Sequence, residues 1–404
     1  MPLRPPAGFI SAFFDPLRNP NAPTIGTATG GDTTASVAFT APANPGGSAI
    51  TAYYAVSNPG QVTGTSATSP VSVTGLTNGT AYTFNVWALN SYGPGVFSAA
   101  SNSVTPAFIA YAVFGGGANT GGSASSVIDY VNIATTGNAT FWGNLTVTGN
   151  NGPVSASSTT RGVYAGISSS TSVMTYITFS TTGNSVTFGN MLGNYRQMGG
   201  TSNATRGLFA GGPFANLIQY ITIATTGNTT SFGALNIADW GNPAGCASPT
   251  RALFGGGNMN DAPYGYYNRI NYVTIATTGN ASTFGNLTQT RTAATGASSS
   301  TRGIFAGGGL SDGTTMTNVI DYVTIASTGN ATDFGDLTVA RSSPAGASNN
   351  SRGVFGGGGP ATNTSSNTID YITIASAGNA TAFGNLTTNR RYGGACGNAG
   401  GGLQ

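Results

Sequence analysis

Short apolar runs separated by polar turn residues return in nearly the same form six times between residue 108 and the end of the 404-residue chain. In the last copy they occupy residues 353–355, 369–374 and 380–386, with Gly, Asn and Ser between them. Runs of this length, rich in Val, Ile, Tyr and Phe and bounded by turn residues, predict short strands. One copy alone could not bury its apolar side chains, so the copies must pack against one another.

The copies align on one aromatic residue, at intervals of 44 to 52 residues: Tyr130, Tyr176, Tyr220, Tyr272, Tyr322 and Tyr371. This spacing fits a four-stranded propeller blade and is too long for leucine-rich or hexapeptide solenoids. In the last copy, residues 341–349 are mostly Ser, Ala and Gly, which predicts the crowded innermost strand. Gly353–Phe355 begins the second strand, residues 369–374 form the third, and Phe383 lies on the fourth.

An Arg early in the first strand, a Gly pair ending the second, a Tyr in the third and an aromatic in the fourth resemble the kelch motif across residues 108–404. The fourth strand departs from that family, because Trp142 alone keeps the larger ring and the other copies carry Phe188, Phe232, Phe284, Phe334 and Phe383. The first copy lacks an inner strand, whereas residues 390–396 at the chain end repeat the pattern of 341–347. We therefore predict an all-β fold with a six-bladed kelch-like propeller closed by the C-terminal strand.

Residues 22–107 show period-two alternation interrupted by turns about every ten residues, which is typical of a sandwich. Residues 36–42, 46–53 and 76–95 together resemble a fibronectin type III domain. Tyr82 stands where that family keeps its tyrosine corner, and Phe39 replaces the usual core Trp. The resemblance implies a spacer module more readily than a binding one.

Residues 1–21 are too few for a domain, yet they contain Phe9, Ile10, Phe13 and Phe14. We interpret them as a docking peptide for a partner, with packing on the adjacent domain as the alternative. No run of about 18 apolar residues occurs, so we expect no membrane span, and the segment lacks the cleavage site of a signal peptide.

Charge is scarce: the 13 basic residues are all Arg, the 10 acidic residues are all Asp, and His is absent. Most acid–base catalysis and most zinc or copper sites depend on residue types that this chain lacks, so we expect no enzyme activity, cofactor or metal. A net charge of +3 without a basic stripe argues against nucleic acid as a partner. Cys246 and Cys396 lie in different repeats, and we expect two buried thiols rather than a disulfide.

Five Arg residues precede the second strand: Arg161, Arg206, Arg251, Arg302 and Arg352. They could gather an anion, as the Arg cluster of sialidases does. Their identical placement favours a structural role, in which each Arg donates to carbonyls or stacks on an aromatic ring.

Departures from the repeat predict where binding takes place, because they fall in links on one face of the propeller. The candidate ligand-binding residues are Tyr195, Arg196, Asp239, Trp240, Asp261, Tyr264, Tyr266, Tyr267 and Arg269. Aromatic rings with polar neighbours suit sugars, so a host glycan is the candidate ligand. Alternatively, the rings pack on one another, and Arg196 is the repeat Arg seen again at Arg291 and Arg341.

A Lys-free chain of sandwich and propeller modules resembles phage virion proteins such as tail fibres. We expect a non-enzymatic virion protein that attaches to a host glycan, with residues 1–21 docked to other virion proteins and several copies presented together as a homo-oligomer. A glycan-active virion enzyme and a secreted bacterial adhesin are the alternatives.

Truncation at residue 387 tests the closure of the ring. Removing the residues that follow it should lower the melting temperature sharply, because two sheet edges would be left unpaired. An unchanged melting temperature in differential scanning calorimetry would contradict closure by the C-terminal strand.

Overall fold

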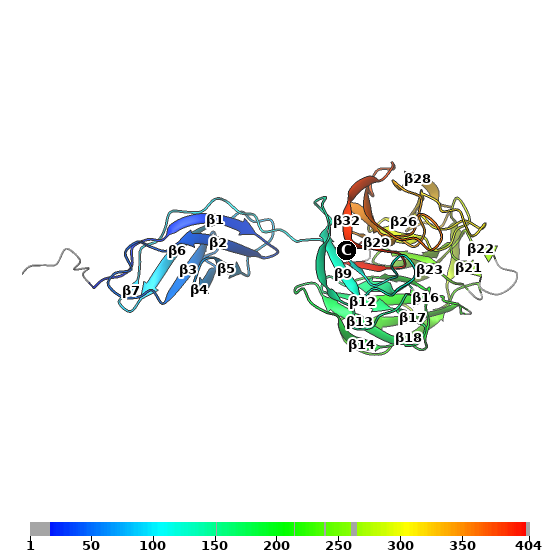
Figure 1. The fold of residues 1–404 in the computed structure, drawn as a ribbon, viewed down its shortest axis with the longest axis horizontal. Coiled ribbons are helices and arrows are strands. Elements are labelled where there is room, and N and C mark those ends of the chain that lie inside the picture. Colours follow the sequence, from blue (N-terminus) through cyan, green and yellow to red (C-terminus); the bar gives the residue numbers. More distant parts are fainter. Residues whose placement is uncertain (1–16, 151, 214, 238–239, 260–264, 401–404) are drawn as a thin grey trace, which may run out of the picture. The chain divides into compact units, whose positions relative to one another are not determined.

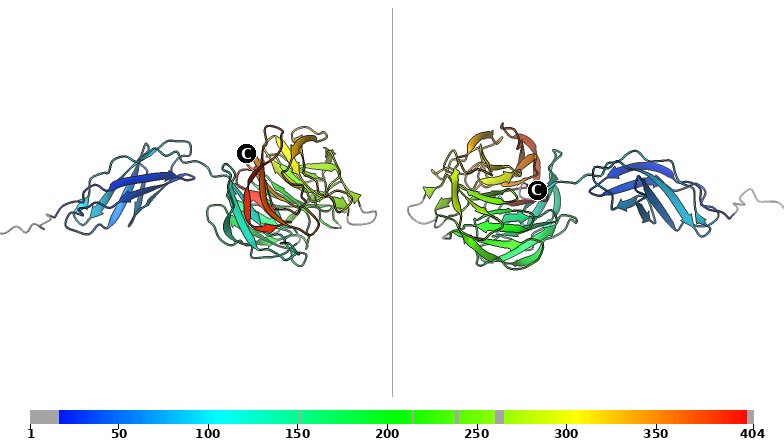
Figure 2. Two further views of the ribbon diagram at one scale, coloured as in Figure 1. Left: turned by 45° about the horizontal axis from the view of Figure 1, so that its top comes forward. Right: turned by 180° about the vertical axis from the view of Figure 1, so that it is seen from behind.

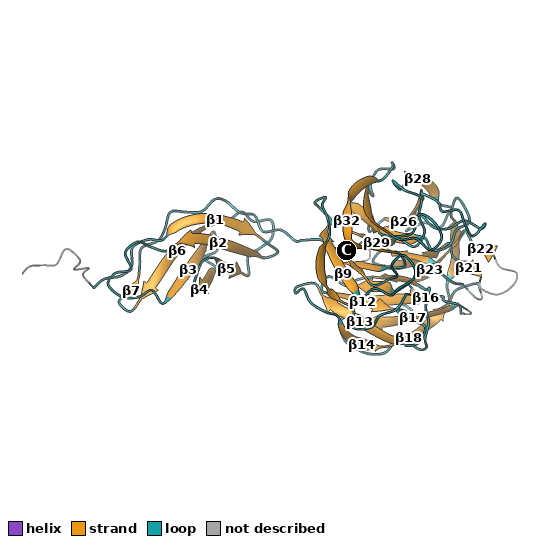
Figure 3. Cartoon of the chain, in the orientation of Figure 1, coloured by secondary structure: helices purple, strands orange, loops and turns teal. Residues whose placement is uncertain are grey.

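The computed structural model describes residues 17–150, 152–213, 215–237, 240–259 and 265–400. Every regular element in these ranges is a β-strand (Figure 3). The chain divides into two compact units between Ile109 and Ala110. The all-β prediction is confirmed for both units.

The first unit is a seven-stranded sandwich whose strands alternate buried and accessible positions. One sheet contains β1 (Thr24–Gly30), β2 (Thr34–Thr40) and β5 (Val71–Thr74). The other contains β4 (Thr63–Ser66), β3 (Ala52–Asn58), β6 (Thr83–Asn90) and β7 (Gly93–Pro94). The Tyr82 hydroxyl accepts a hydrogen bond from the Thr77 N–H at 3.1 Å, as the tyrosine corner requires. Phe39 fills the core beside Tyr53, with 4.5 Å between ring centroids.

Of the predicted docking peptide, residues 1–16 lie outside the described residues. The part that is described is attached to the sandwich. The Arg18 N–H donates to the Gly46 carbonyl at 2.9 Å, and the Asn21 N–H donates to the Asn44 carbonyl at 3.1 Å. Docking of residues 1–21 to a partner therefore stays a prediction.

The second unit contains six four-stranded antiparallel sheets, which are the six predicted blades (Figures 1 and 2). Blade 1 pairs β33 (Gly394–Gly397), β8 (Tyr111–Gly115), β9 (Val127–Asn132) and β10 (Thr140–Asn144). Blade 2 contains β11 (Val154–Ser157), β12 (Arg161–Ala165), β13 (Val173–Thr178) and β14 (Val186–Asn190). Blade 3 contains β15 (Gly199–Ser202), β16 (Arg206–Ala210), β17 (Leu217–Thr222) and β18 (Thr230–Ala234).

Blade 4 contains β19 (Ala244–Ala247), β20 (Arg251–Gly255), β23 (Arg269–Thr274) and β24 (Ser282–Asn286). A small hairpin, β21 (Asn258–Met259) and β22 (Gly265–Tyr266), is inserted between its second and third strands. Blade 5 contains β25 (Thr295–Ser298), β26 (Arg302–Ala306), β27 (Val319–Thr324) and β28 (Thr332–Asp336). Blade 6 contains β29 (Ala345–Ser348), β30 (Arg352–Gly356), β31 (Ser366–Thr373) and β32 (Thr381–Arg390).

The last strand of the chain closes the ring, as predicted. β33 pairs antiparallel with β8, and Cys396 lies opposite Val113. In Figure 1 the red C-terminal segment lies at the first blade. The first and last strands of the propeller therefore lie in one sheet, that of blade 1, and its innermost position is filled.

The inner strands of neighbouring blades approach backbone to backbone. A Cβ atom added at Gly296 would lie 2.0 Å from the Gly245 carbonyl oxygen, and one at Gly245 would lie 2.4 Å from that of Gly200. Only glycine fits at such separations, because real Cβ contacts are much longer. This confirms why the first strand of each repeat is so poor in large side chains.

The five Arg residues before the second strands are structural, as the repeat predicted. The Arg161 guanidinium lies 4.9 Å from the ring centroid of Tyr176 in its own blade. Its Nη1 also donates to the carbonyl of Ala224 in the next blade, at 2.6 Å. Arg206, Arg251, Arg302 and Arg352 repeat both contacts around the ring. Each Arg therefore joins two blades.

Blade 1 lacks this Arg and compensates with aromatic rings. Tyr111 occupies the position of Arg161, and its ring packs edge-on against Tyr130 at 5.5 Å and Trp142 at 5.9 Å. The larger Trp142 ring, kept in this blade alone, accompanies the missing Arg.

A buried ion pair between Arg and Asp joins neighbouring blades at three of the blade boundaries. The Arg291 Nη2 atom lies 2.8 Å from an Asp321 carboxylate oxygen, and both side chains are fully buried. The Thr288 hydroxyl and N–H, from the same link as Arg291, donate to the Asp321 carboxylate at 2.7 and 3.0 Å. The same Leu-Thr-x-x-Arg link holds Asp370 through Thr338 and Arg341, and Asp129 through Thr387 and Arg390. We call this contact the Arg–Asp latch.

The latch predicts a large loss of stability when one partner is removed. Asp321→Ala should reduce the unfolding free energy by about 3–5 kcal/mol, because the buried Arg291 guanidinium would keep no counter-charge. The double variant Arg291→Trp with Asp321→Asn should recover most of the loss. It reproduces the neutral pair that Trp240 and Asn271 form at the same positions before blade 4. Asp336→Ala, on the outer strand of blade 5, is the matched control. Equal losses for Asp321→Ala and Asp336→Ala in urea denaturation would contradict a stabilising latch.

Candidate functional site

The links between blades and the links from second to third strands meet on one face of the propeller, as predicted. The Asn242 side-chain amide donates to the Asn258 side-chain oxygen at 3.0 Å, and the Thr292 hydroxyl donates to the same oxygen at 2.9 Å. On the closing blade, the Arg391 Nη2 donates to the Asn363 side-chain oxygen at 2.9 Å. We call this side of the propeller the link face.

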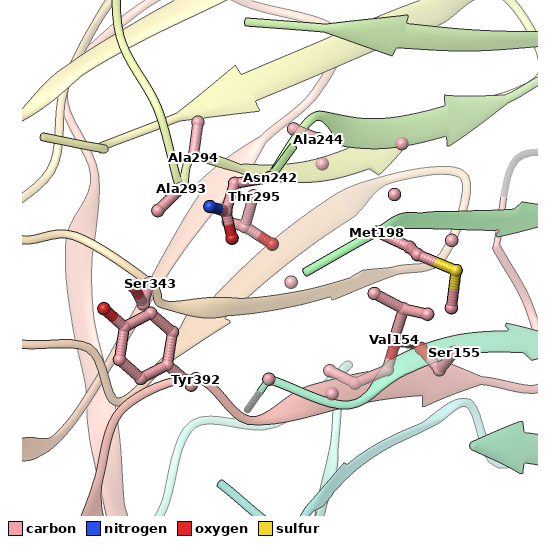
Figure 4. A pocket seen from close by; sticks show the side chains of 18 of the residues that line it. Val154, Ser155, Met198, Asn242, Ala244, Ala293, Ala294, Thr295, Ser343 and Tyr392 are labelled. Atoms are coloured by element: carbon pink, nitrogen blue, oxygen red, sulfur yellow. Dashed lines mark hydrogen bonds between the residues drawn. The ribbon is translucent and has the colours of Figure 1, made fainter. Parts of the chain in front are cut away.

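A cavity of about 110 Å³ opens on the link face at the propeller axis. It is lined by the beginnings of the inner strands of all six blades, so every repeat contributes to it (Figure 4). A second cavity of about 80 Å³ continues along the axis, and the two share Ser155, Gly200, Gly245, Gly296, Gly346 and Ala395. None of the described residues lining either cavity is charged.

Six residues, one from each link between blades, line the rim of the first cavity with a left-handed backbone. Their φ angles are 51–78°, and they are Gly152, Gln197, Asn242, Ala293, Ser343 and Tyr392. Three pairs of neighbouring members are joined by backbone hydrogen bonds, such as the Ser343 N–H to the Ala293 carbonyl at 2.8 Å. We call this set the axial ring. The backbone is the same at each position, whereas the side chains differ in size and polarity.

Sequence reasoning did not find the axial ring. Tyr392 and Ser343 lie inside segments that were interpreted as inner strands, and a left-handed φ at a Tyr or a Gln has no sequence signature. The only available signal was the alignment of the links with one another, in which this position varies more than its neighbours.

Trp240 was predicted to contact ligand on an exposed surface, and this prediction is wrong. Its side chain is fully buried, and its ring packs edge-on against Tyr267 at 6.1 Å between centroids. Trp240 precedes the axial-ring residue Asn242 by two positions, as Arg291 precedes Ala293, so it occupies the latch position of its link. The latch Asp is replaced there by Asn271, which accepts a hydrogen bond from the Asn236 N–H at 3.0 Å.

Tyr195, like Trp240, stands where other links carry the latch Arg. It precedes Gln197 by two residues and therefore occupies the latch position, while Gln219 replaces the latch Asp and accepts from the Leu192 N–H at 3.1 Å. The interpretation of Arg196 as the equivalent of Arg291 and Arg341 is therefore wrong by one residue. Both Tyr195 and Arg196 are half-buried.

The remaining candidates divide into those that reach the link face and those that are not described. Tyr266 is half-buried on the β21–β22 hairpin, and burial together with the nearby Asp312 and Tyr392 raises its pKa. Tyr267 packs on the core of blades 3 and 4, and Arg269 is exposed at the start of β23. Asp239, Asp261 and Tyr264 lie outside the described residues.

The described carboxylates do not line the axial cavity. Asp129, Asp321 and Asp370 are buried in latches, and Asp333 and Asp336 lie on the outer strand β28. Asp312 is exposed, and hydrogen bonds from Thr315 and Thr314 lower its pKa to about 2. No three carboxylate or thiol side chains gather as metal ligands in the described part of the chain. The described residues contain no helix long and apolar enough to cross a membrane.

Comparison with known proteins agrees with both units. Residues 21–104 match the family model described as "Fibronectin type III domain". The solved structure titled "Structure of YjhT", a kelch-type propeller protein, is similar with a TM-score of 0.50 and 10% sequence identity, covering 61% of this chain and 87% of that chain. At this identity the likeness shows the fold alone. A search of curated proteins finds no match.

The cysteines provide a test of this packing. Both are buried free thiols, as predicted, and burial raises the pKa of each to about 12. At pH 8 neither thiol forms appreciable thiolate in the folded protein, so Ellman's reagent should label neither. Urea sufficient to unfold the propeller should expose both. Rapid labelling of the native protein would contradict the buried positions.

Proposed function

We propose that this chain is a non-enzymatic virion structural protein, a tail fibre or similar surface appendage, whose propeller attaches the particle to host glycans. The observation that carries the non-enzymatic part is the chemistry of the axial cavity. Its described lining is neutral, and three carboxylates of the chain are held in buried latches away from it. Glycoside hydrolysis uses two carboxyl groups on either side of the scissile bond, and this lining supplies none.

Support for a recognition role comes from the construction of the link face. The blades are joined by repeated stacked Arg residues, latches and inner-strand contacts, so side chains on the links are held on a rigid framework. Variable residues on a rigid scaffold are the usual arrangement of a binding surface. The rim combines hydroxyl, amide and aromatic side chains, which suit the polar edges and apolar faces of sugars.

The virion setting is supported by composition and modular order. The chain contains no Lys, Glu or His, and a Gly-rich propeller follows a sandwich module. Presentation of several copies on one particle would convert a weak single-site affinity into firm adhesion through effective concentration.

The experiment uses the full chain, both free and coupled in many copies to beads, on an array of immobilised host-surface glycans. We expect weak binding of the free protein, about millimolar, and retention of the coupled beads, because multivalency multiplies a weak contact. A reducing-end assay on the bound polysaccharide should show no turnover. Release of reducing ends above that from heat-unfolded protein would overturn the non-enzymatic proposal.

The virion assignment needs its own measurement. Antibodies raised against the propeller should decorate purified phage particles from the same source in immunogold electron microscopy. Particles that remain unlabelled, although the antibody recognises the free protein, would favour the adhesin alternative.

A further inference from the structure

The non-glycine residues with a left-handed backbone in the described propeller are concentrated at one place. Six non-glycine residues of the described propeller have a positive φ, and five of them belong to the axial ring: Gln197, Asn242, Ala293, Ser343 and Tyr392. The sixth is Asn363. The chain contains 63 Gly residues, and most of its other positive-φ positions are glycine. A side chain in this conformation is strained, and such strain is typical of functional sites.

Ser343 adds a second, independent observation. Its side chain is only 6% exposed, and its hydroxyl oxygen is buried with no hydrogen-bond partner among the described residues. A buried hydroxyl without a partner is destabilising, because it has lost its hydrogen bonds to water and gained none in the protein. Ser343 lines the axial cavity, and rotation about its Cα–Cβ bond would bring the hydroxyl to a bound molecule that supplies the missing hydrogen bond (Figure 4).

Tyr392 places an aromatic ring beside this hydroxyl. The Tyr392 N–H donates to the Ser343 carbonyl at 3.1 Å, so the two residues are neighbours on the rim. The Arg391 guanidinium lies 5.1 Å from the centroid of the Tyr392 ring, and the ring itself lines the cavity (Figure 4). An aromatic ring next to a hydroxyl without a partner can contact the apolar face of a sugar while the hydroxyl bonds to its edge.

We infer that the axial ring forms a subsite for one neutral hexose residue, with Tyr392 against the sugar face and the Ser343 hydroxyl bonded to a sugar hydroxyl. This inference rests on the proposed glycan-binding function and names the class of sugar. A cavity of about 110 Å³ holds several water molecules at roughly 10–15 Å³ each, which suits one sugar ring rather than a chain. No described lining residue is charged, and the nearby Arg391 guanidinium is engaged with the Tyr392 ring and the Asn363 side-chain oxygen, so the lining itself supplies no ion pair to the carboxylate of an acidic sugar.

Gln197 and Asn242 place side-chain amides on the rim across the cavity from Ser343 and Tyr392. Both are half-buried on the rim, and Asn242 is held by its hydrogen bond to Asn258. Amides and hydroxyls can each donate and accept, so each side chain can bond to a sugar hydroxyl. Hydrogen bonds from Gln197 and Asn242 would distinguish hexoses that differ in the orientation of their hydroxyls.

The test uses the whole 404-residue chain and saturation-transfer NMR with the methyl glycosides of glucose, galactose, mannose, N-acetylneuraminic acid and glucuronic acid. We expect saturation transfer to at least one neutral hexoside and none to the two acidic sugars. Tyr392→Ala should weaken binding about tenfold through loss of the ring contact, and Ser343→Ala should weaken it about three- to tenfold through loss of one hydrogen bond. Ala293 shows that alanine is accommodated at this backbone position.

Stability separates a binding role from a packing role. Ser343→Ala removes a hydroxyl without a partner, so its melting temperature should be unchanged or raised while its affinity falls. Gln61→Ala, at a positive-φ position of the sandwich, and Tyr92→Ala, at an exposed tyrosine, are matched controls that should bind as the unaltered protein does.

The outcomes distinguish the two proposals. Binding that Tyr392→Ala and Ser343→Ala leave intact would overturn the axial subsite while keeping glycan recognition. Preferential binding of the acidic sugars would overturn the neutral specificity. No glycan bound by the unaltered protein, in this assay and on the array, would overturn both the subsite and the proposed function.

Discussion

The propeller depends on the contact by which one blade captures the carboxylate of the next. In the Arg–Asp latch, a Thr and an Arg from a single link supply three of the hydrogen bonds to a fully buried Asp. Burying a charge is unfavourable unless it is paired and hydrogen-bonded, so the contact tolerates little displacement between blades. At the seam, the latch of Arg390 and Asp129 joins residues from opposite ends of the propeller and adds to the pairing of β33 with β8.

The latch also explains the departures from the repeat that first suggested a binding site. Three links carry the charged pair, and two others carry Tyr195 with Gln219 or Trp240 with Asn271. A buried Arg without Asp, or the reverse, would leave an uncompensated charge, so both members change together. Such paired substitutions are a packing solution, and aromatic residues on variable links are a poor guide to function when their partner in the next blade is not considered.

Close packing at the axis restricts side chains within the inner strands but not on the rim of the axial cavity. The inner strands touch through their backbones, so side chains within them must be small. Immediately before these strands the chain turns with a left-handed backbone, and there the axial ring presents side chains that the packing does not dictate. The invariant framework of the repeat therefore places one freely variable residue per blade around a common opening.

The sequence by itself determined the number of blades, the order of their strands, the closing strand, the sandwich domain and the structural role of the Arg series. These features follow from local periodicity and from a motif repeated six times, so each copy tests the same interpretation. Tertiary structure alone decided which variable residues are buried, as for Trp240, and which face the axis, as for Ser343 and Tyr392. That distinction depends on a partner in the neighbouring blade, about 30 residues along the chain, and on a backbone dihedral angle that residue type does not reveal.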